Sequence, residues 1–257
     1  MNNKKRFNQI VKDIKEVKIQ GARNIAKAAL EAYSLFPSKK TAKKLLSLRP
    51  TEPMMENVLN LAEKGHSLNS INAHFKEAQD KINQKVFKLI ENGDIIFTHC
   101  HSTNVVNALI YAKKKGKKFE VYNTETRPLY QGRKTAKQLK NAKIKVTMFT
   151  DSAVDVVLSG EQKIKKPDKV FLGADAITKK GIVNKIGSEI IAVFAKQNKI
   201  PVYIIADSWK FTNSKVPLEQ RQLNEVWDKA PKHIKIKNPA FEFVEGKYVT
   251  KVVTEKS

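Results

Sequence analysis

Residues 94–125 read DIIFTHCHSTNVVNALIYAKKKGKKFEVYNTE, and this stretch decides the fold. It contains two short runs rich in β-branched and aromatic residues, DIIFTH and KFEVYNTE, with a segment of helical character between them that starts near Ser102. Two strands joined by a helix-length connection lie parallel in one sheet. The stretch therefore predicts a strand, a helix and a second, parallel strand.

The same alternation continues toward the C-terminus. Three further runs, IKVTMFT, DKVFLGAD and PVYIIAD, are each followed by a segment with helical features. Strands of this kind, buried on both faces, are typical of a doubly wound, Rossmann-like parallel sheet. No G-x-G-x-x-G follows the first strand and no Walker A lysine loop is present, which disfavours the dinucleotide and nucleoside-triphosphate versions of the fold.

The first ninety residues have a different, helical pattern. Apolar residues recur at helical spacing over residues 10–33, with an interruption near Gly21, and further helices are predicted over 39–48, 53–64 and 68–90. We therefore expect an α/β protein in which a helical N-terminal domain, residues 1–92, precedes a Rossmann-like catalytic domain, residues 93–257.

Composition narrows the classes of protein that fit. The chain has 257 residues, 41% hydrophobic and 29% charged, and a formal net charge of +24. This charge attracts polyanions, but its lysines are spread along the chain, so a solvated surface is the simpler interpretation and nucleic-acid binding stays open. The sequence has no apolar run of about 18 residues and no apolar signal core, so we expect a cytoplasmic protein without a membrane partner.

The residues that leave the predicted strands form the candidate site. Ligands of open parallel sheets bind beyond the carboxyl ends of the strands, where these polar residues should converge. They include Cys100, His101, Ser102, Thr103, Thr124, Glu125, Thr126, Arg127, Thr150, Asp151, Ser152, Asp175, Asp207, Ser208 and Lys210. A thiol, hydroxyls, carboxylates and cations together predict a pocket for a small polar anion.

Two of these residues carry candidate acid–base chemistry. Cys100 lies at a strand-to-helix turn, where the helix dipole favours a thiolate; the alternative is an inert, buried cysteine. Asp175 follows the apolar run Val170–Ala174, which should raise its pKa so that it carries a proton; the alternative is a carboxylate that caps a turn. His99 and His101 flank Cys100 but lack a third ligand at metal spacing, so we predict no metal site.

Several cations are candidates for binding phosphate. Arg127, Arg133, Lys185 and Lys210 are close in sequence to the predicted strand ends, and surface ion pairs are the alternative for each. Arg49 lies in a loop between predicted helices, where we expect it to be unpaired and free to bind an anion.

Long motifs in the chain resemble one protein superfamily. These motifs are IQGARNIAKAA, THCHSTNVVNAL, NTETRPLYQGRKTAKQL, FLGADAITKKGIVNKIGSEIIAVFAKQNKIPVYIIAD and NPAFEFVEGKYVTKVVTE. The chain from residue 19 to the C-terminus resembles the superfamily of ribose-1,5-bisphosphate isomerases, methylthioribose-1-phosphate isomerases and the alpha, beta and delta subunits of translation initiation factor 2B. The resemblance implies the same two-domain fold and a homodimer or a dimer-based homohexamer.

The resemblance also implies roles for individual residues. Cys100 in the T-H-C motif and Asp175 in the G-A-D motif correspond to the catalytic pair of the isomerases, which need no cofactor. The residues implied to bind substrate are Gly21, Ala22, Arg23, Arg49, Ser102, Thr103, Asn104, Arg127, Asn184, Lys185 and Lys210. The chain departs from the family pattern at Gln20 and Arg23, in a shorter loop between Asp175 and Asn184, and at His101.

The implied reaction converts ribose 1,5-bisphosphate to ribulose 1,5-bisphosphate by acid–base catalysis, in the breakdown of nucleoside monophosphates such as AMP. One alternative is a methylthioribose-1-phosphate isomerase, and another is a non-catalytic regulatory subunit like those of initiation factor 2B. The pair Cys100 and Asp175 favours an enzyme, and the cations Arg23 and Arg49 favour a substrate with a second phosphate. Oligomer size and a nucleotide activator stay open.

Overall fold

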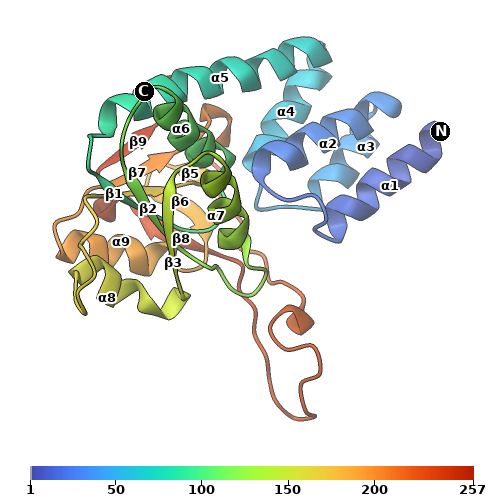
Figure 1. Ribbon diagram of the computed structural model, residues 1–257. Coiled ribbons are helices and arrows are strands. Elements are labelled where there is room, and N and C mark those ends of the chain that lie inside the picture. The colour runs from blue at the N-terminus through green and yellow to red at the C-terminus, as the bar shows by residue number, and fades with distance from the viewer. Residues whose placement is uncertain (1) are drawn as a thin grey trace.

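The computed structural model describes residues 2–257, and it begins with a group of helices (Figure 1). These are α1 (Asn3–Lys15), α2 (Ala22–Leu35), α3 (Lys39–Leu46), α4 (Pro53–Glu63) and α5 (Leu68–Leu89). Local chemistry sets their starts: Gly21, with a φ of 84°, is the N-cap residue immediately before α2. The side chains of Ser38 and Ser67 cap α3 and α5 by accepting hydrogen bonds from the backbone N–H groups of Thr41 and Ser70.

The rest of the chain is built around a six-stranded parallel sheet in the order β3-β2-β1-β4-β7-β9. Its strands are β1 (Ile95–Thr98), β2 (Glu120–Thr124), β3 (Lys145–Phe149), β4 (Lys169–Leu172), β7 (Val202–Ile205) and β9 (Lys251–Val253). The connecting helices are α6 (Thr103–Lys114), α7 (Gln131–Asn141), α8 (Val154–Ser159) and α9 (Ser188–Gln197). The structure thus confirms the fold class, a helical N-terminal part followed by a Rossmann-like sheet.

Alternate strand residues face opposite layers of helices. Phe97 of β1 and Val170 of β4 lie in the core beneath α8 and α9, whereas Ile96 and Phe171 lie in the core beneath α6. The end of α5 also joins this second core, so it packs on the sheet although the division at residue 92 assigns it to the N-terminal part. That division stays a prediction. The edge strand β3 is partly exposed, with Met148 39% exposed, so our expectation that every strand is buried on both faces was wrong.

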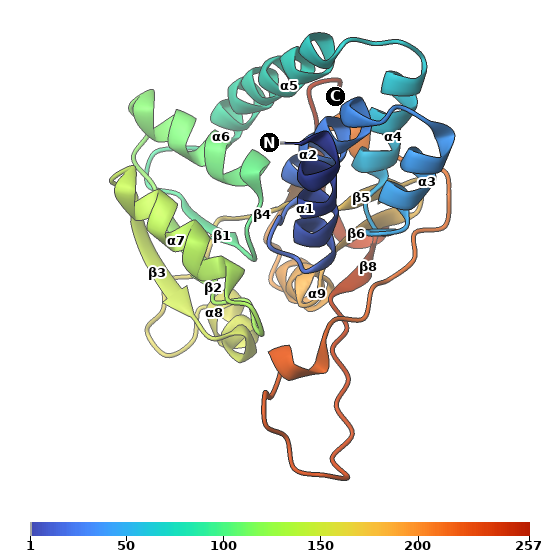
Figure 2. The same ribbon diagram turned by 90° about the vertical axis from the view of Figure 1, so that its right-hand side faces the viewer.

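Two features were not predicted from the sequence. A small antiparallel sheet combines β5 (Ala176–Thr178), β6 (Gly181–Lys185) and β8 (Phe241–Glu245). Between η2 (Ser208–Lys210) and β8, a long segment contains only the short helix η3 (Leu223–Glu225). Figures 1 and 2 show part of this segment, which we call the arm (residues 211–240), extending away from the rest of the molecule. The short elements η1 (Asp151–Ala153) and η4 (Gly246–Tyr248) complete the fold.

Within residues 2–257, no helix combines the length and the apolar character needed to cross a membrane.

Candidate functional site

A pocket lies where the carboxyl ends of β1 and β4 meet the start of α2 and the turn before α4. It contains both residues of the candidate acid–base pair. Of the other residues implied to bind substrate, the pocket is lined by Gly21, Ala22, Arg23, Arg49, Ser102, Thr103, Asn104, Asn184, Lys185 and Lys210. The structure therefore brings together in one pocket residues that are spread over nearly 190 positions of the chain (21 to 210).

Cys100 is held by its backbone. Its φ of 64° places it in the left-handed region, in the turn between β1 and the first residue of α6. Its N–H donates to Oγ1 of Thr126 at 2.9 Å, and its carbonyl oxygen accepts from Oγ1 of Thr135 at 2.8 Å. An unfavourable backbone conformation secured on both sides leaves the thiol facing the pocket, as is common for residues at functional sites.

The close approach of β4 to Ser102 explains the glycine of the G-A-D motif. A Cβ atom placed on Gly173 would lie 2.7 Å from both Cβ and Oγ of Ser102. Ser102 caps α6, because its Oγ accepts a hydrogen bond from the N–H of Val105 at 3.4 Å. Gly173 therefore allows the end of β4, which leads into Asp175, to lie against the start of α6, which follows Cys100.

The protonation of Cys100 differs from our expectation of a thiolate. Burial raises the pKa of the Cys100 thiol to about 11, although the positive charge of Lys185 acts in the opposite direction. Cys100 also precedes the Ser102 cap of α6, so its thiol is not inside the first turn, where the helix dipole is strongest. The free pocket therefore holds a neutral thiol at neutral pH, and the expectation of a resting thiolate was wrong.

The pKa of Asp175 is shifted upward, in the direction that we expected from the sequence. Burial raises the pKa of the Asp175 carboxyl, and the cations Lys210, Arg49 and Lys185 act to lower it. Its N–H donates to the carbonyl oxygen of Val183 at 2.8 Å, which fixes it at the start of the β5–β6 hairpin. A carboxyl whose pKa is raised by burial holds its proton to higher pH than an exposed aspartate does, and can act as an acid.

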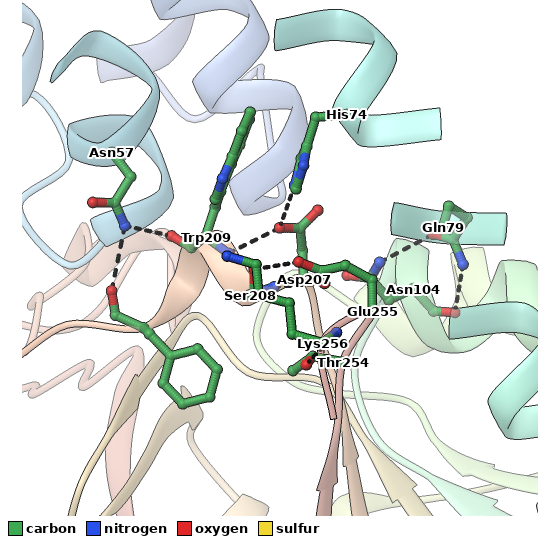
Figure 3. A network of polar contacts seen from close by, with 11 residues as sticks. Asn57, His74, Gln79, Asn104, Asp207, Ser208, Trp209, Thr254, Glu255 and Lys256 are labelled. Atoms are coloured by element: carbon green, nitrogen blue, oxygen red, sulfur yellow. Dashed lines mark hydrogen bonds and ion pairs between the residues drawn. The ribbon is translucent and has the colours of Figure 1, made fainter. Parts of the chain in front are cut away.

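Lys210 is positioned from outside the pocket by the network in Figure 3. The ring of Trp209 stacks on His74 of α5 with a centroid distance of 3.6 Å. Oδ1 of Asp207 lies 3.1 Å from Nε2 of His74 and accepts from the N–H of Trp209 at 2.9 Å. Lys210, buried next to this network, donates from Nζ to the carbonyl oxygen of Ala174, so its ammonium lies beside Asp175.

The same network contains three side chains of types that can bind a metal ion. Ligand atoms of His74, Asp207 and Glu255 all lie within 4.8 Å of one another. Both carboxylates already accept hydrogen bonds from the chain, since Glu255 accepts from the N–H and the hydroxyl of Ser208. These bonds give the cluster a structural role in holding η2.

Arg49 is not the unpaired arginine that we expected. It is only 6% exposed, and its Nε–H donates to both carboxylate oxygens of Glu219 in the arm, at 3.0 and 3.2 Å. Its Nη2 lies 3.4 Å from Oε1 of Glu52, whereas Nη1 is buried without a hydrogen-bond partner. The loop position of Arg49 was predicted correctly, but two of its three nitrogens contact carboxylates of the fold, and only Nη1 is without a partner.

The two histidines next to Cys100 are neutral. Nε2 of His99 donates to the carbonyl oxygen of Ile186 at 2.9 Å, and Nδ1 of His99 is 2.5 Å from Oγ1 of Thr124. Nδ1 of His101 is 3.0 Å from Oγ1 of Thr135. Burial lowers the pKa of both rings to about 4. Both rings therefore support the turn that presents Cys100 and add no charge to the pocket.

The structure does not bring Arg127 to the pocket. Its side chain is exposed, donates to the hydroxyl of Tyr130, and lies 3.3 Å from the carbonyl oxygen of Val226 in the arm. The backbone N–H groups of Thr126 and Arg127 are bound by the carboxylate of Asp151, at 2.8 and 2.6 Å. Asp151 thus has a structural role, and the phosphate-binding role implied for Arg127 lacks a geometric basis in the free protein.

Sequence reasoning missed several lining residues. Arg133 was a candidate cation, but it stacks on Tyr130 at 3.6 Å and pairs with Glu125, whereas Gln131 and Lys134 line the pocket. The three-residue spacing of Gln131 and Lys134 on α7 is a signal that could have been used. The other missed lining residues include Glu52 and Arg221, for which the sequence gives no comparable signal.

Fold and pocket together define an α/β protein with a pocket lined by arginine and lysine residues at the strand ends of a Rossmann-like sheet. The chain belongs to the initiation factor 2 subunit family, whose sequence profile matches residues 5–256. A ribose 1,5-bisphosphate isomerase of Methanocaldococcus jannaschii is 35% identical over 94% of this chain and 87% of its own length.

Solved structures share this fold along almost the whole chain. The translation initiation factor eIF-2B of Pyrococcus horikoshii OT3 is 25% identical, with a TM-score of 0.85 over 98% of this chain and 96% of that chain. The 5-methylthioribose 1-phosphate isomerase of the same organism is 23% identical, with a TM-score of 0.77 over 98% of this chain and 83% of that chain.

Proposed function

We propose that this protein is an isomerase that converts ribose 1,5-bisphosphate to ribulose 1,5-bisphosphate. The observation that carries the proposal is the meeting of Cys100 and Asp175 in one pocket with several buried or half-buried cations. An aldose-to-ketose isomerisation needs one group that accepts a proton, one that donates it, and cations that hold phosphate. The identity to a protein that bears this enzyme's name supports the choice of substrate.

The two residues divide the proton transfers between them. Asp175, protonated, donates to the ring oxygen as the sugar ring opens. Cys100, as thiolate, removes the proton from C2, and the C–H electron pair forms the C1=C2 double bond of an enol. The thiol then protonates C1, while the C2 hydroxyl gives its proton to Asp175 and becomes the ketone. These transfers balance, and both residues return to their starting forms.

Because the pKa of Cys100 is raised, the thiol has to lose its proton before these transfers can begin. A proton that moves from the thiol to an ionised Asp175 produces the thiolate and the carboxylic acid together, without changing the charge of the pocket. Lys185 acts to lower the pKa of both groups and so stabilises each of them in its charged form. The reactive form is therefore a minor one, which ligand binding has to favour.

Phosphate binding is assigned to two sides of the pocket. On one side, Gly21, Ala22 and Arg23 present the start of α2 and a guanidinium. On the other, Lys185 and Lys210 are buried, and the free Nη1 of Arg49 requires an acceptor. A methylthioribose phosphate has an apolar group in place of the second phosphate, which fits these cations less well.

We assign the arm to a contact between copies of this chain. Six of its large apolar side chains are exposed by 38–50%, namely Phe211, Leu218, Leu223, Val226, Trp227 and Ile234. Exposed apolar groups on one projecting segment are typical of an interface. Light scattering should give at least a dimer, and Trp227→Ser should shift it toward the monomer; a monomeric parent would contradict the assignment.

The decisive assay follows ketose formation by NMR from ribose 1,5-bisphosphate and, separately, from methylthioribose 1-phosphate. We expect turnover of the bisphosphate only. Cys100→Ser should bind substrate and keep its fold while turnover falls by at least ~10²-fold, the scale of a lost general base. Turnover of neither sugar by a folded parent protein would support a regulatory role instead of catalysis.

A further inference from the structure

Glu52 is a buried carboxyl of the pocket that the proposed reaction does not use. It precedes the first residue of α4, yet its side chain makes no capping hydrogen bond to that helix. The side chain is 1% exposed and lines the same pocket as Cys100 and Asp175. Its Oε1 has only the 3.4 Å contact with Nη2 of Arg49, and its Oε2 has no hydrogen-bond partner.

The charged groups that act on Glu52 come from four parts of the chain. Arg49 belongs to the same turn, Asp175 follows β4, Lys210 ends η2, and Glu219 belongs to the arm. If all of them were charged, three carboxylates would lie near the cations Arg49, Lys210 and, beside Asp175, Lys185. An ionised Glu52 would then place a negative charge, with one unpartnered oxygen, in a pocket that has to accept an anion.

A proton held by Glu52 removes this charge, and the hydrogen bonds around Arg49 favour Glu52 over Glu219 as its carrier. Glu219 receives two hydrogen bonds from Arg49, so it is stabilised as an anion. Glu52 has one long contact and one unpartnered oxygen, and a buried ionised carboxylate without partners is costly. Burial and the neighbouring Asp175 raise the pKa of Glu52 to about 8, against the opposing effect of Arg49 and Lys210.

We infer that Glu52 is a ligand-binding residue in its protonated form: its unpartnered oxygen carries the hydrogen donated to an anionic ligand, beside the free Nη1 of Arg49. A carboxyl kept neutral by its surroundings can donate such a hydrogen bond at pH 7. Ionisation of Glu52 removes the donor and adds a negative charge, so it weakens anion binding. The inference rests on the proposed function for the class of ligand, a phosphorylated sugar.

The test measures binding rather than turnover. The probe is ribulose 1,5-bisphosphate, titrated calorimetrically at pH 7 and pH 9; its phosphate monoesters have a second pKa near 6 and are mostly dianionic at both values. For the parent protein we expect Kd to rise by roughly tenfold between these values, as ionisation at a pKa near 8 requires. An unchanged Kd in the parent overturns the inference without any variant.

Two variants assign the effect to one residue. Glu52→Gln keeps a neutral donor, so its Kd should show no rise between pH 7 and pH 9. Glu63→Gln makes the same chemical change at the exposed end of α4, and should retain the rise seen in the parent. If Glu52→Gln shows the same rise as the parent, Glu52 does not control binding.

A stability measurement gives a readout independent of the ligand. Because the pKa of Glu52 is raised in the folded state, the folded protein loses stability as pH rises from about 4.5, the ordinary value, to about 8. The melting temperature of the parent should fall more across this range than that of Glu52→Gln.

If this difference is found but ribose 1,5-bisphosphate is not isomerised, the proposed function fails while the protonation of Glu52 stands. If isomerisation is found but the two melting curves shift equally with pH, the inference fails alone.

Discussion

Arg49 and Glu219, 170 residues apart in sequence, form a buried ion pair in which Nε–H lies 3.0 Å from Oε1 and 3.2 Å from Oε2. The pair joins the turn before α4 to the arm. Nearby, Oγ1 of Thr51 donates to the carbonyl oxygen of Pro217 at 2.7 Å, so the two segments are joined by backbone as well as by charge. One wall of the pocket therefore depends on a contact between the N-terminal helices and the arm.

Replacing Glu219 by Ala should loosen this wall. The change leaves Arg49 buried with only the long contact to Glu52, and breaking a buried ion pair typically costs about 3–5 kcal/mol. Urea unfolding should show a loss of this order, and hydrogen exchange should rise at residues 217–221. Glu161→Ala, an exposed change distant in sequence, serves as the control. Unchanged exchange in the arm would mean that backbone contacts alone hold it.

The approach of Gly173 to Ser102 gives a second prediction. Gly173→Ala places a methyl group 2.7 Å from the Ser102 side chain, so either β4 or the start of α6 has to move. Overpacking of this kind costs about 1–3 kcal/mol, and it should also reduce turnover because Cys100 and Asp175 move apart. Gly116→Ala is a matched control, since that glycine has a φ of 93° and open space around its Cβ position.

The control should lose about 1 kcal/mol through backbone strain alone. Its turnover should stay at the parental level, because Gly116 lies in the turn after α6, at the end away from Cys100. Equal losses of turnover in both variants would show that stability, rather than the spacing of the pair, limits the reaction.

Lys210 lines the pocket, whereas Arg127 does not, and replacing each of them should therefore have different effects on substrate binding. Lys210→Ala removes a buried ammonium beside Asp175, so we expect substrate affinity to fall by about 1.5–3 kcal/mol, the scale of a charged hydrogen bond. Arg127→Ala removes an exposed side chain that contacts Tyr130 and the arm, and substrate affinity should change by less than about 0.5 kcal/mol. Calorimetric titration of both variants checks this. A large loss for Arg127→Ala would mean that the arm rearranges when ligand binds.

The sequence predicted the parts of this fold that rest on local chemistry. Helix α5 was expected over 68–90 and lies at Leu68–Leu89, because its apolar spacing and the capping Ser67 are both local signals. The sheet of β5, β6 and β8 was missed, since β6 pairs with a strand 56 or more residues further along the chain and nothing near Gly181 indicates that partner.

Some parts of the site could likewise be predicted from the sequence, and others could not. Cys100 and Asp175 follow strands, so their convergence could be predicted from the topology of a parallel sheet. Ion pairs between distant segments could not be predicted. Arg49 was expected to be unpaired, since its partner Glu219 is 170 residues away in the sequence. The burial that makes the Cys100 thiol neutral and gives Glu52 an unusual pKa arises from packing between segments, which no local pattern encodes.

The pH dependence of kcat offers a test of the acid–base pair. The reactive form holds one proton between Cys100 and Asp175, and the profile depends on the number of protons rather than on which residue holds them. Asp175 interacts with the three cations Lys210, Arg49 and Lys185, whereas Lys185 is the cation that lowers the pKa of Cys100, so the carboxyl should ionise first as pH rises.

The order of the two ionisations sets which residue controls each limb of the kcat–pH profile. Activity should rise as Asp175 loses its proton, reach a plateau, and fall as Cys100 ionises near its pKa of about 11. This order reverses the assignment that an unperturbed thiolate would have given, in which the cysteine sets the acidic limb. Measuring kcat at saturating substrate keeps the effect of Glu52 on binding out of the profile.

Asp175→Asn distinguishes the residues behind the limbs. Asparagine keeps the shape of the side chain but donates no proton for ring opening, so the variant should bind substrate and turn over at least ~10²-fold more slowly. Its remaining activity needs only the Cys100 thiolate, and kcat should therefore rise steadily with pH up to about 10, without the plateau that the parent reaches once Asp175 is ionised. A variant that binds poorly but reacts at the parental rate when saturated would make Asp175 a positioning residue. Asp151 could not simply replace it, because both of its carboxylate oxygens already accept backbone hydrogen bonds from Thr126 and Arg127.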